Sequence, residues 1–190
     1  MPPSPSRTMK ILLPLVLLAA LAGCATLNRD ECLTADWYHL GTRDGSAGYP
    51  MSRLSEHRTA CAEFGVYPDE ARYAAGRNAG LVAYCQPANA VRQGLAGNGY
   101  SGVCPLPMHY QFAELNRIAN AVHTAHERLE SLERRQDSLE HELHSKKLPD
   151  DKRRHLREAL RDLDHDIDHA RDELRWRELD LDRAYAMPWR

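Results

Sequence analysis

The sequence predicts an all-α protein in which a small disulfide-stapled helical domain is followed by an antiparallel coiled-coil hairpin. All eleven glycines and all five cysteines fall before residue 105. After that point charged residues dominate, and apolar residues recur every three or four positions. That spacing places apolar side chains on one face of a helix. We therefore predict a domain boundary at residue 105, with a compact region before it and a hairpin after it.

The first segment has the layout of a bacterial secretory signal peptide. Arg7 and Lys10 supply a positive start, and residues 11–21 form a nearly unbroken apolar run. Such a run is too short to span a bilayer as a mature helix, which needs roughly 20 apolar residues. We expect residues 1–23 to be removed. Translation starting at Met1 or at Met9 fits this layout equally.

The residues before Cys24, Leu21-Ala22-Gly23, resemble the lipobox of bacterial lipoproteins. The resemblance implies cleavage before Cys24 and lipidation there, with a diacylglyceryl thioether and a further acyl chain such as palmitate. In Gram-negative lipoproteins an Asp after the lipidated cysteine retains the protein in the inner membrane. Here that residue is Ala25. The resemblance thus implies a lipid anchor in the outer membrane, on its periplasmic side.

Composition bears on possible partners and cofactors. The formal net charge is −2, which together with export argues against a nucleic-acid partner. No Gly-x-Ser-x-Gly or His-Glu-x-x-His motif occurs. Ser55, Glu56 and His57 are adjacent, but neighbouring residues on a helix point to different faces. We expect a non-enzymatic protein without a cofactor.

Four cysteines remain once Cys24 is lipidated, and in the oxidising periplasm they predict two disulfides. A four-cysteine metal site is the alternative, but the sequence lacks close Cys-x-x-Cys spacing. Four cysteines allow three connectivities. Cys32 precedes the first predicted helix and Cys61 lies near the end of the second, which runs back antiparallel. We therefore predict the pairs Cys32–Cys61 and Cys85–Cys104.

Capping and breaking residues divide the region before residue 105 into four predicted helices. These helices begin near Thr34, Ser52, Pro68 and Asn89.

Two of these helices carry stripes of glycine and aromatic residues. The first stripe is Trp37, Gly41, Asp44, Gly45 and Gly48, and the second is Tyr73, Gly76, Gly80 and Tyr84. A glycine inside a helix costs about 1 kcal/mol relative to alanine, so a row of them needs a reason. Close packing of two helix backbones is that reason. The alternative, a phosphate-binding loop, would need a preceding strand and a following Lys-Ser/Thr pair.

The joint pattern of cysteines, glycines and aromatics over residues 24–105 resembles the DUF2799 family of small bacterial lipoproteins of unknown function. The residues that carry it are Cys32, the Trp37 stripe, Cys61, Gly65, Pro68, Asp69, the Tyr73 stripe, Cys85, Gly94, Gly99, Tyr100, Gly102 and Cys104. The resemblance implies location and architecture, and it brings no catalytic residues.

Residues 106–190 predict a charged antiparallel hairpin. A seam of apolar residues runs from Leu115 to Leu143, and a second runs from Leu156 to Leu181, weakened at Arg177. The short break at Pro149 makes the two arms antiparallel neighbours. We expect the seam residues to contact only one another.

Two functions follow as hypotheses. The first is an envelope lipoprotein with a structural or protein-docking role, whose hairpin binds an envelope protein or a second copy. The second is a periplasmic metal-binding protein that uses surface histidines, with His141, His144 and His155 as ligands near the turn. The heptad register places these three side chains toward solvent, which favours solvated surface over a metal site.

Overall fold

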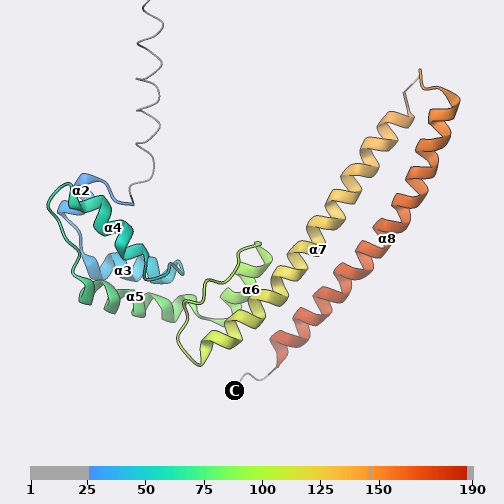
Figure 1. Ribbon diagram of the computed structural model, residues 1–190. Helices are drawn as coiled ribbons and strands as arrows, with labels where there is room; N and C mark the ends of the chain where they lie inside the picture. The colour runs from blue at the N-terminus through green and yellow to red at the C-terminus, as the bar shows by residue number, and fades with distance from the viewer. Residues whose placement is uncertain (1–25, 146, 188–190) are drawn as a thin grey trace, which may run out of the picture. The chain divides into compact units, whose positions relative to one another are not determined.

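The computed structural model describes residues 26–145 and 147–187, and every regular element among them is a helix (Figure 1). This confirms the all-α fold class. The predicted signal peptide, the lipidated Cys24 and Ala25 lie outside the described residues. Of the helices that can be described, none is both long and apolar enough to cross a membrane.

The chain forms two compact units that meet between Gly80 and Leu81, inside helix α5. The sequence predicts a boundary at residue 105, which falls inside the second unit. The shift in composition therefore does not coincide with the division of the packing.

Within residues 26–80, the described part of unit 1, there are four helices. They are α2 (Arg29–Leu33), α3 (Trp37–Ser46), α4 (Arg53–Ala62) and the larger part of α5 (Glu70–Tyr84). The predicted cap at Thr34 is wrong, because Thr34 ends α2. Asp36 caps α3 instead, and its Oδ1 accepts hydrogen bonds from the amides of Tyr38 at 3.0 Å and His39 at 3.3 Å. A carboxylate directly before the helix satisfies two otherwise unpaired amides.

The core of unit 1 gathers around the Cys32–Cys61 disulfide. Its buried apolar members are Leu27, Cys32, Trp37, Leu40, Leu54, Cys61 and Tyr73. The pairing of Cys32 with Cys61 is as predicted, but Cys32 lies in a short helix, α2, that the sequence analysis does not predict, and the disulfide joins this helix to α4. Because a five-residue helix is not stable alone, this bond and the buried Leu27 hold the start of the described chain in place.

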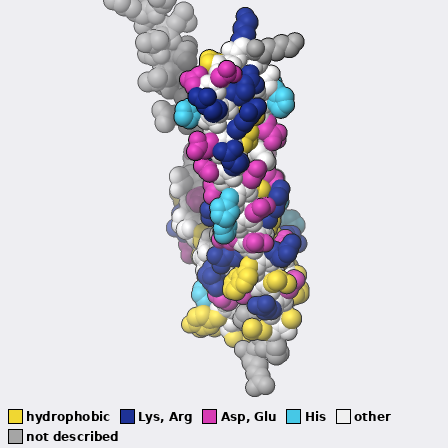
Figure 2. Space-filling view, turned by 90° about the vertical axis from the view of Figure 1, so that its right-hand side faces the viewer, with side chains coloured by type: hydrophobic (Ala, Val, Ile, Leu, Met, Phe, Trp, Pro, Cys, Tyr) yellow, Lys and Arg dark blue, Asp and Glu magenta, His cyan; other side chains and the backbone are white. Residues whose placement is uncertain are grey.

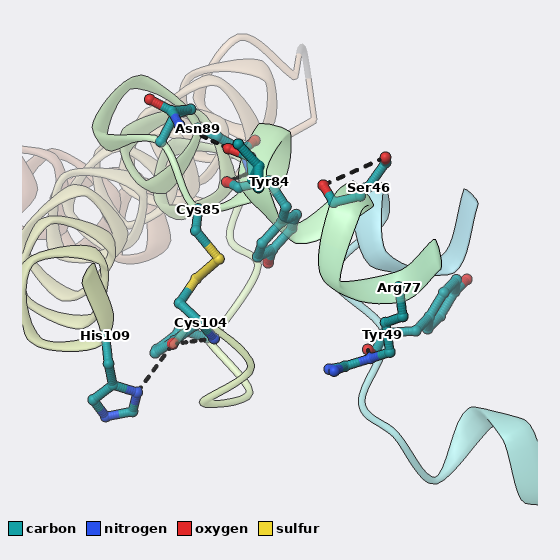
Figure 3. Close-up of a disulfide and its surroundings, with 12 residues drawn as sticks. Ser46, Tyr49, Arg77, Tyr84, Cys85, Asn89, Cys104 and His109 are labelled. Atoms are coloured by element: carbon teal, nitrogen blue, oxygen red, sulfur yellow. Dashed lines mark hydrogen bonds between the residues drawn. A yellow bond between two sulfur atoms is a disulfide. The ribbon is translucent and has the colours of Figure 1, made fainter. Parts of the chain in front are cut away.

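Unit 2 begins with the last turn of α5 and continues with α6 (Pro87–Leu95). The Cys85–Cys104 disulfide closes the segment around α6 (Figure 3), again as predicted. Beside it, the Tyr84 ring stacks on Phe112 with 5.1 Å between ring centroids. A Cβ at Gly94 would lie less than 3.0 Å from the backbone oxygen of Asn116, so α6 packs closely on the following helix.

Two long helices complete unit 2, α7 (Met108–Leu143) and α8 (Asp150–Ala186). They form the predicted antiparallel pair (Figure 1). The expectation that seam residues contact only one another is wrong for the base of the hairpin. Leu115 and Ile118 of α7 share a core with Leu81, Ala90 and the disulfide. The base is therefore covered by α6, whereas the outer half is a two-helix seam.

Candidate functional site

Helices α3 and α5 meet backbone to backbone at glycines of both predicted stripes. A Cβ on Gly41 would lie less than 3.0 Å from the carbonyl oxygen of Tyr73, and one on Gly76 would meet that of Tyr38. Gly45 and Gly80 are equally confined by backbone of the opposite helix. Only hydrogen fits at these positions, which is the physical reason for glycine inside the two helices.

Gly48 has a different role from the one the stripe predicts. Helix α3 ends at Ser46, and Gly48 has a φ of 78°. Its amide donates to Gly45 O at 3.0 Å, and the next amide, Tyr49, donates to Asp44 O at 2.9 Å. A glycine in the left-handed region ends many helices in this way. Gly48 thus lies past the end of α3 and belongs to the turn that terminates the helix.

Below the glycine contacts lies a buried chain of polar side chains. Asp44 Oδ2 accepts hydrogen bonds from Tyr73 Oη at 2.8 Å and from His57 Nε2 at 2.7 Å. On the other side of the imidazole, Nδ1 lies 2.7 Å from Thr26 Oγ1. Tyr73 and His57 are fully buried and Asp44 is 2% exposed. These four side chains, here called the Asp44 network, join α3, α4 and α5 to the start of the described chain.

The network determines the charge state of its members. Burial raises the pKa of Asp44, but the hydrogen bonds from His57 and Tyr73 and the electrostatic influence of His57 and Arg43 bring it below the ordinary 3.8. Burial, the hydrogen bond to Asp44 and the Asp44 charge raise the pKa of Tyr73. Asp44 is therefore an ionised carboxylate held by two donors, an arrangement in which a buried charge is tolerated.

Thr26, His57 and Asp44 are residue types that could serve as the nucleophile, base and acid of a catalytic triad. The burial of His57 and Asp44 argues for a structural role, because a substrate cannot reach groups that solvent does not reach. Sequence reasoning missed His57 by judging it against its neighbours Ser55 and Glu56. The available signal was its spacing from Leu54 and Cys61, three and four residues away on the same face of α4.

Unit 2 carries an exposed hollow on the hairpin. It has a volume of about 540 Å³ and is lined by Arg128, His169, Asp172, Glu173, Trp176 and Arg177. Trp176 is 60% exposed, and Arg128 Nη1 lies 3.4 Å from Glu173 Oε2 across the two helices. Figure 2 shows hydrophobic side chains gathering at the end of this face away from the α7–α8 turn, whereas Lys and Arg are dense near the turn.

The hollow exists because the seam changes at Arg177, the position where the sequence predicts weakening. Arg177 faces small residues of α7, namely Ala121, Thr124 and Ala125, and together they line an adjoining hollow of about 260 Å³. An arginine cannot fill the seam as a leucine does, since its charged group must stay near water. The result is a groove with an aromatic rim and a small-residue floor, here called the Trp176 groove.

The histidines near the turn are not brought together as a metal site. His141, His144 and His155 are all exposed, and His144 Nδ1 lies 2.7 Å from Glu140 O of its own helix. Within residues 26–145 and 147–187, no group of three or more His, Cys, Asp or Glu is placed to hold a metal ion. The rings of His165 and His169, farther along α8, lie 4.6 Å apart between centroids.

These features define a small all-helical protein with two disulfides, a glycine-mediated helix contact and an appended hairpin. Residues 36–120 match the family model described as a protein of unknown function, DUF2799. Over this region the chain belongs to that family. The match extends past residue 105 into α7, which is consistent with the packing of the first turns of α7 on α6. No curated protein and no solved structure matches the chain.

Proposed function

We propose that this protein is a non-enzymatic lipoprotein of the bacterial cell envelope that presents its hairpin as a docking surface for another protein. The lipobox at Cys24 supports lipid anchoring, and Ala25 after it supports the periplasmic face of the outer membrane. Two or more acyl chains anchor stably, because each buried methylene contributes about 0.8 kcal/mol.

The Trp176 groove is the observation that carries the docking proposal. Tryptophan and arginine are enriched among residues that dominate binding energy at protein interfaces. Here Trp176 is 60% exposed beside Arg128 and Arg177. Small residues on α7, Ala121 and Thr124, line the adjoining hollow and leave room beside Arg177. An exposed aromatic at the edge of a groove is more useful for binding a partner than for stabilising the hairpin.

Anchoring is tested by replacing Cys24 with Ser in the full-length chain. We expect the variant to remain unprocessed and to leave the membrane fraction after a high-salt wash. A Cys24→Ser chain that still fractionates with membranes would show that the anchor is elsewhere.

Docking is tested with a photo-crosslinking amino acid at Trp176 in intact cells. Glu158 provides the matched control, because it is exposed and lies on the same helix closer to the turn. We expect a crosslinked protein at position 176 and none at 158. Equal crosslinking at both positions would contradict a defined docking surface. A product of twice the chain mass would identify a second copy as the partner.

A further inference from the structure

The described chain is fixed to the core of unit 1 from its first residue. Thr26 Oγ1 lies 2.7 Å from buried His57, and Leu27 is 2% exposed. Asn28 then caps α2 by accepting from the Glu31 amide at 3.0 Å, while its own amide donates to the Glu31 carboxylate at 2.8 Å. Each of these three residues makes its own contact, and the disulfide at Cys32 follows.

This leaves very little chain between the core and the proposed lipid. Cys24 lies only two residues before Thr26, and two extended residues span at most about 7 Å. The headgroup layer on one side of a bilayer is roughly 5–8 Å thick. With the acyl chains of Cys24 in the hydrocarbon, the core of unit 1 has no room to move away from the headgroups.

We infer that unit 1 lies directly against the phospholipid surface, with Leu33 and Tyr67 in contact with the headgroup layer. The inference rests on the acylation of Cys24 proposed above. It adds that the body of unit 1 does not hang on a flexible linker. The Asp44 network has a role in this arrangement, because His57 connects the residue nearest the anchor to the glycine-packed helices.

Two exposed apolar side chains adjoin the fixed segment. Leu33 follows Cys32 and is 51% exposed, and Tyr67 is 71% exposed. Val66, directly before Tyr67, donates its amide to Cys61 O at 3.2 Å and packs on the cluster that contains Leu27. Leu33 is thus bonded to one disulfide cysteine along the chain, and Tyr67 follows a residue that contacts the other, so both lie close to the disulfide in the chain. Tyrosine is enriched where protein meets the membrane interface, which suits an otherwise unexplained exposed ring.

The test uses the mature protein, made by export of the full-length Tyr67→Trp chain in bacteria, and bound to phosphatidylethanolamine and phosphatidylglycerol vesicles with or without a phospholipid brominated near the headgroup. The emission of the unsubstituted protein is subtracted as background. We expect brominated lipid to quench most of the emission that the new tryptophan adds. Emission that is the same in both vesicles would overturn the inference.

An insertion separates the short tether from other causes of membrane contact. A linker of 20 Gly and Ser residues between Ala25 and Thr26 has a root-mean-square span of roughly 25 Å, and we expect it to relieve most of the quenching. The same insert beside Lys147, in the α7–α8 turn, should leave the quenching unchanged. Quenching that survives the first insert would refute the role of the tether. A chain that washes off the vesicles would refute the proposed acylation itself, which distinguishes the two failures.

Discussion

The glycine-packed region of unit 1 and the outer half of the hairpin are both helical, but different contacts hold them together. In unit 1, α3 and α5 touch through backbone atoms at Gly41, Gly45, Gly76 and Gly80. In the outer hairpin, α7 and α8 meet through leucine side chains. From Leu129 onward the seam positions of α7 are only half-buried, whereas Leu163 and Ile167 on α8 are buried.

Polar groups follow the same division. The Asp44 carboxylate is buried and accepts two hydrogen bonds, whereas the outer hairpin has exposed ion pairs. One of these joins Arg171 Nη2 to Glu133 Oε1 at 3.1 Å, with side chains 55% and 43% exposed. Exposed pairs of this kind contribute about 0–1 kcal/mol. The hairpin surface can therefore change with little effect on stability.

The disulfides reinforce the contrast, because both lie in the part of the chain that contains glycine. They close loops of 29 and 19 residues, and each stabilises the fold by about 3 kcal/mol in the chain-entropy description. The comparison teaches that close backbone contacts and a disulfide hold unit 1 in one arrangement, whereas the outer hairpin depends on one seam of apolar side chains.

The sharpest way to break this comparison is Gly76→Ala. The new Cβ would lie less than 3.0 Å from the carbonyl oxygen of Tyr38, and neither backbone can move without separating the helices. We expect a loss of about 3 kcal/mol in urea denaturation followed by circular dichroism. Gly99→Ala is the control, because no atom lies within 4 Å of a Cβ there. Equal stability of the two variants would mean that α3 and α5 do not pack as described.

A smaller effect is expected from Tyr73→Phe, which removes one donor from the buried Asp44 carboxylate. We expect a loss of about 2 kcal/mol near neutral pH, as for a hydrogen bond to a charged group. Tyr110→Phe is the control, since that ring is 71% exposed. The measurement is again urea denaturation.

At acid pH the difference in free energy of unfolding between the wild type and Tyr73→Phe should become smaller. The fold lowers the pKa of Asp44 below 3.8, so its contribution is present above that value and is lost as the pH falls through the lowered pKa. The free energy of unfolding of the wild type should therefore approach that of the variant only as the pH falls below the ordinary pKa of 3.8. A deficit that stays constant from neutral to acid would show that the hydroxyl acts on packing and not on the carboxylate.

Local spacing accounts for what could be predicted from the sequence. The two glycine stripes and the leucine seams repeat at intervals that place their residues on one face of a helix. The even number of cysteines left after Cys24 predicts two disulfides. They are enough for the fold class, for both disulfides and for the contact at Gly41 and Gly76. The prediction for Gly48 is wrong, because the spacing of the stripe continues past the end of α3, and Gly48 has a positive φ there.

Long-range contacts account for what could not be predicted. His57 contacts Thr26 and Asp44, which are 31 and 13 residues away in the sequence. No local sequence pattern predicts these contacts. The sequence predicts a hairpin that folds independently of the cysteine-containing region, because α7 lacks glycine and cysteine. The base of α7 nevertheless packs on α6, because Gly94 has no side chain to block the contact. The Trp176 groove likewise depends on the register between two helices, which the seam positions alone do not fix.

The smallest loss of stability is expected from Leu139→Ala. It can be compared with Leu115→Ala within a single helix, because α7 contains both kinds of environment. Leu115 is fully buried in the core that α6 covers, whereas Leu139 is half-buried in the two-helix seam. We expect Leu115→Ala to cost about 2–5 kcal/mol, and Leu139→Ala to cost only about 1 kcal/mol because little enclosed volume is lost. The outer turns can open without the base, so native-state hydrogen exchange is the measurement. If Leu139→Ala proved as costly as Leu115→Ala, the outer seam would have to be enclosed in solution. A cost that rises with protein concentration would then identify a second copy as the enclosing partner, through mass action.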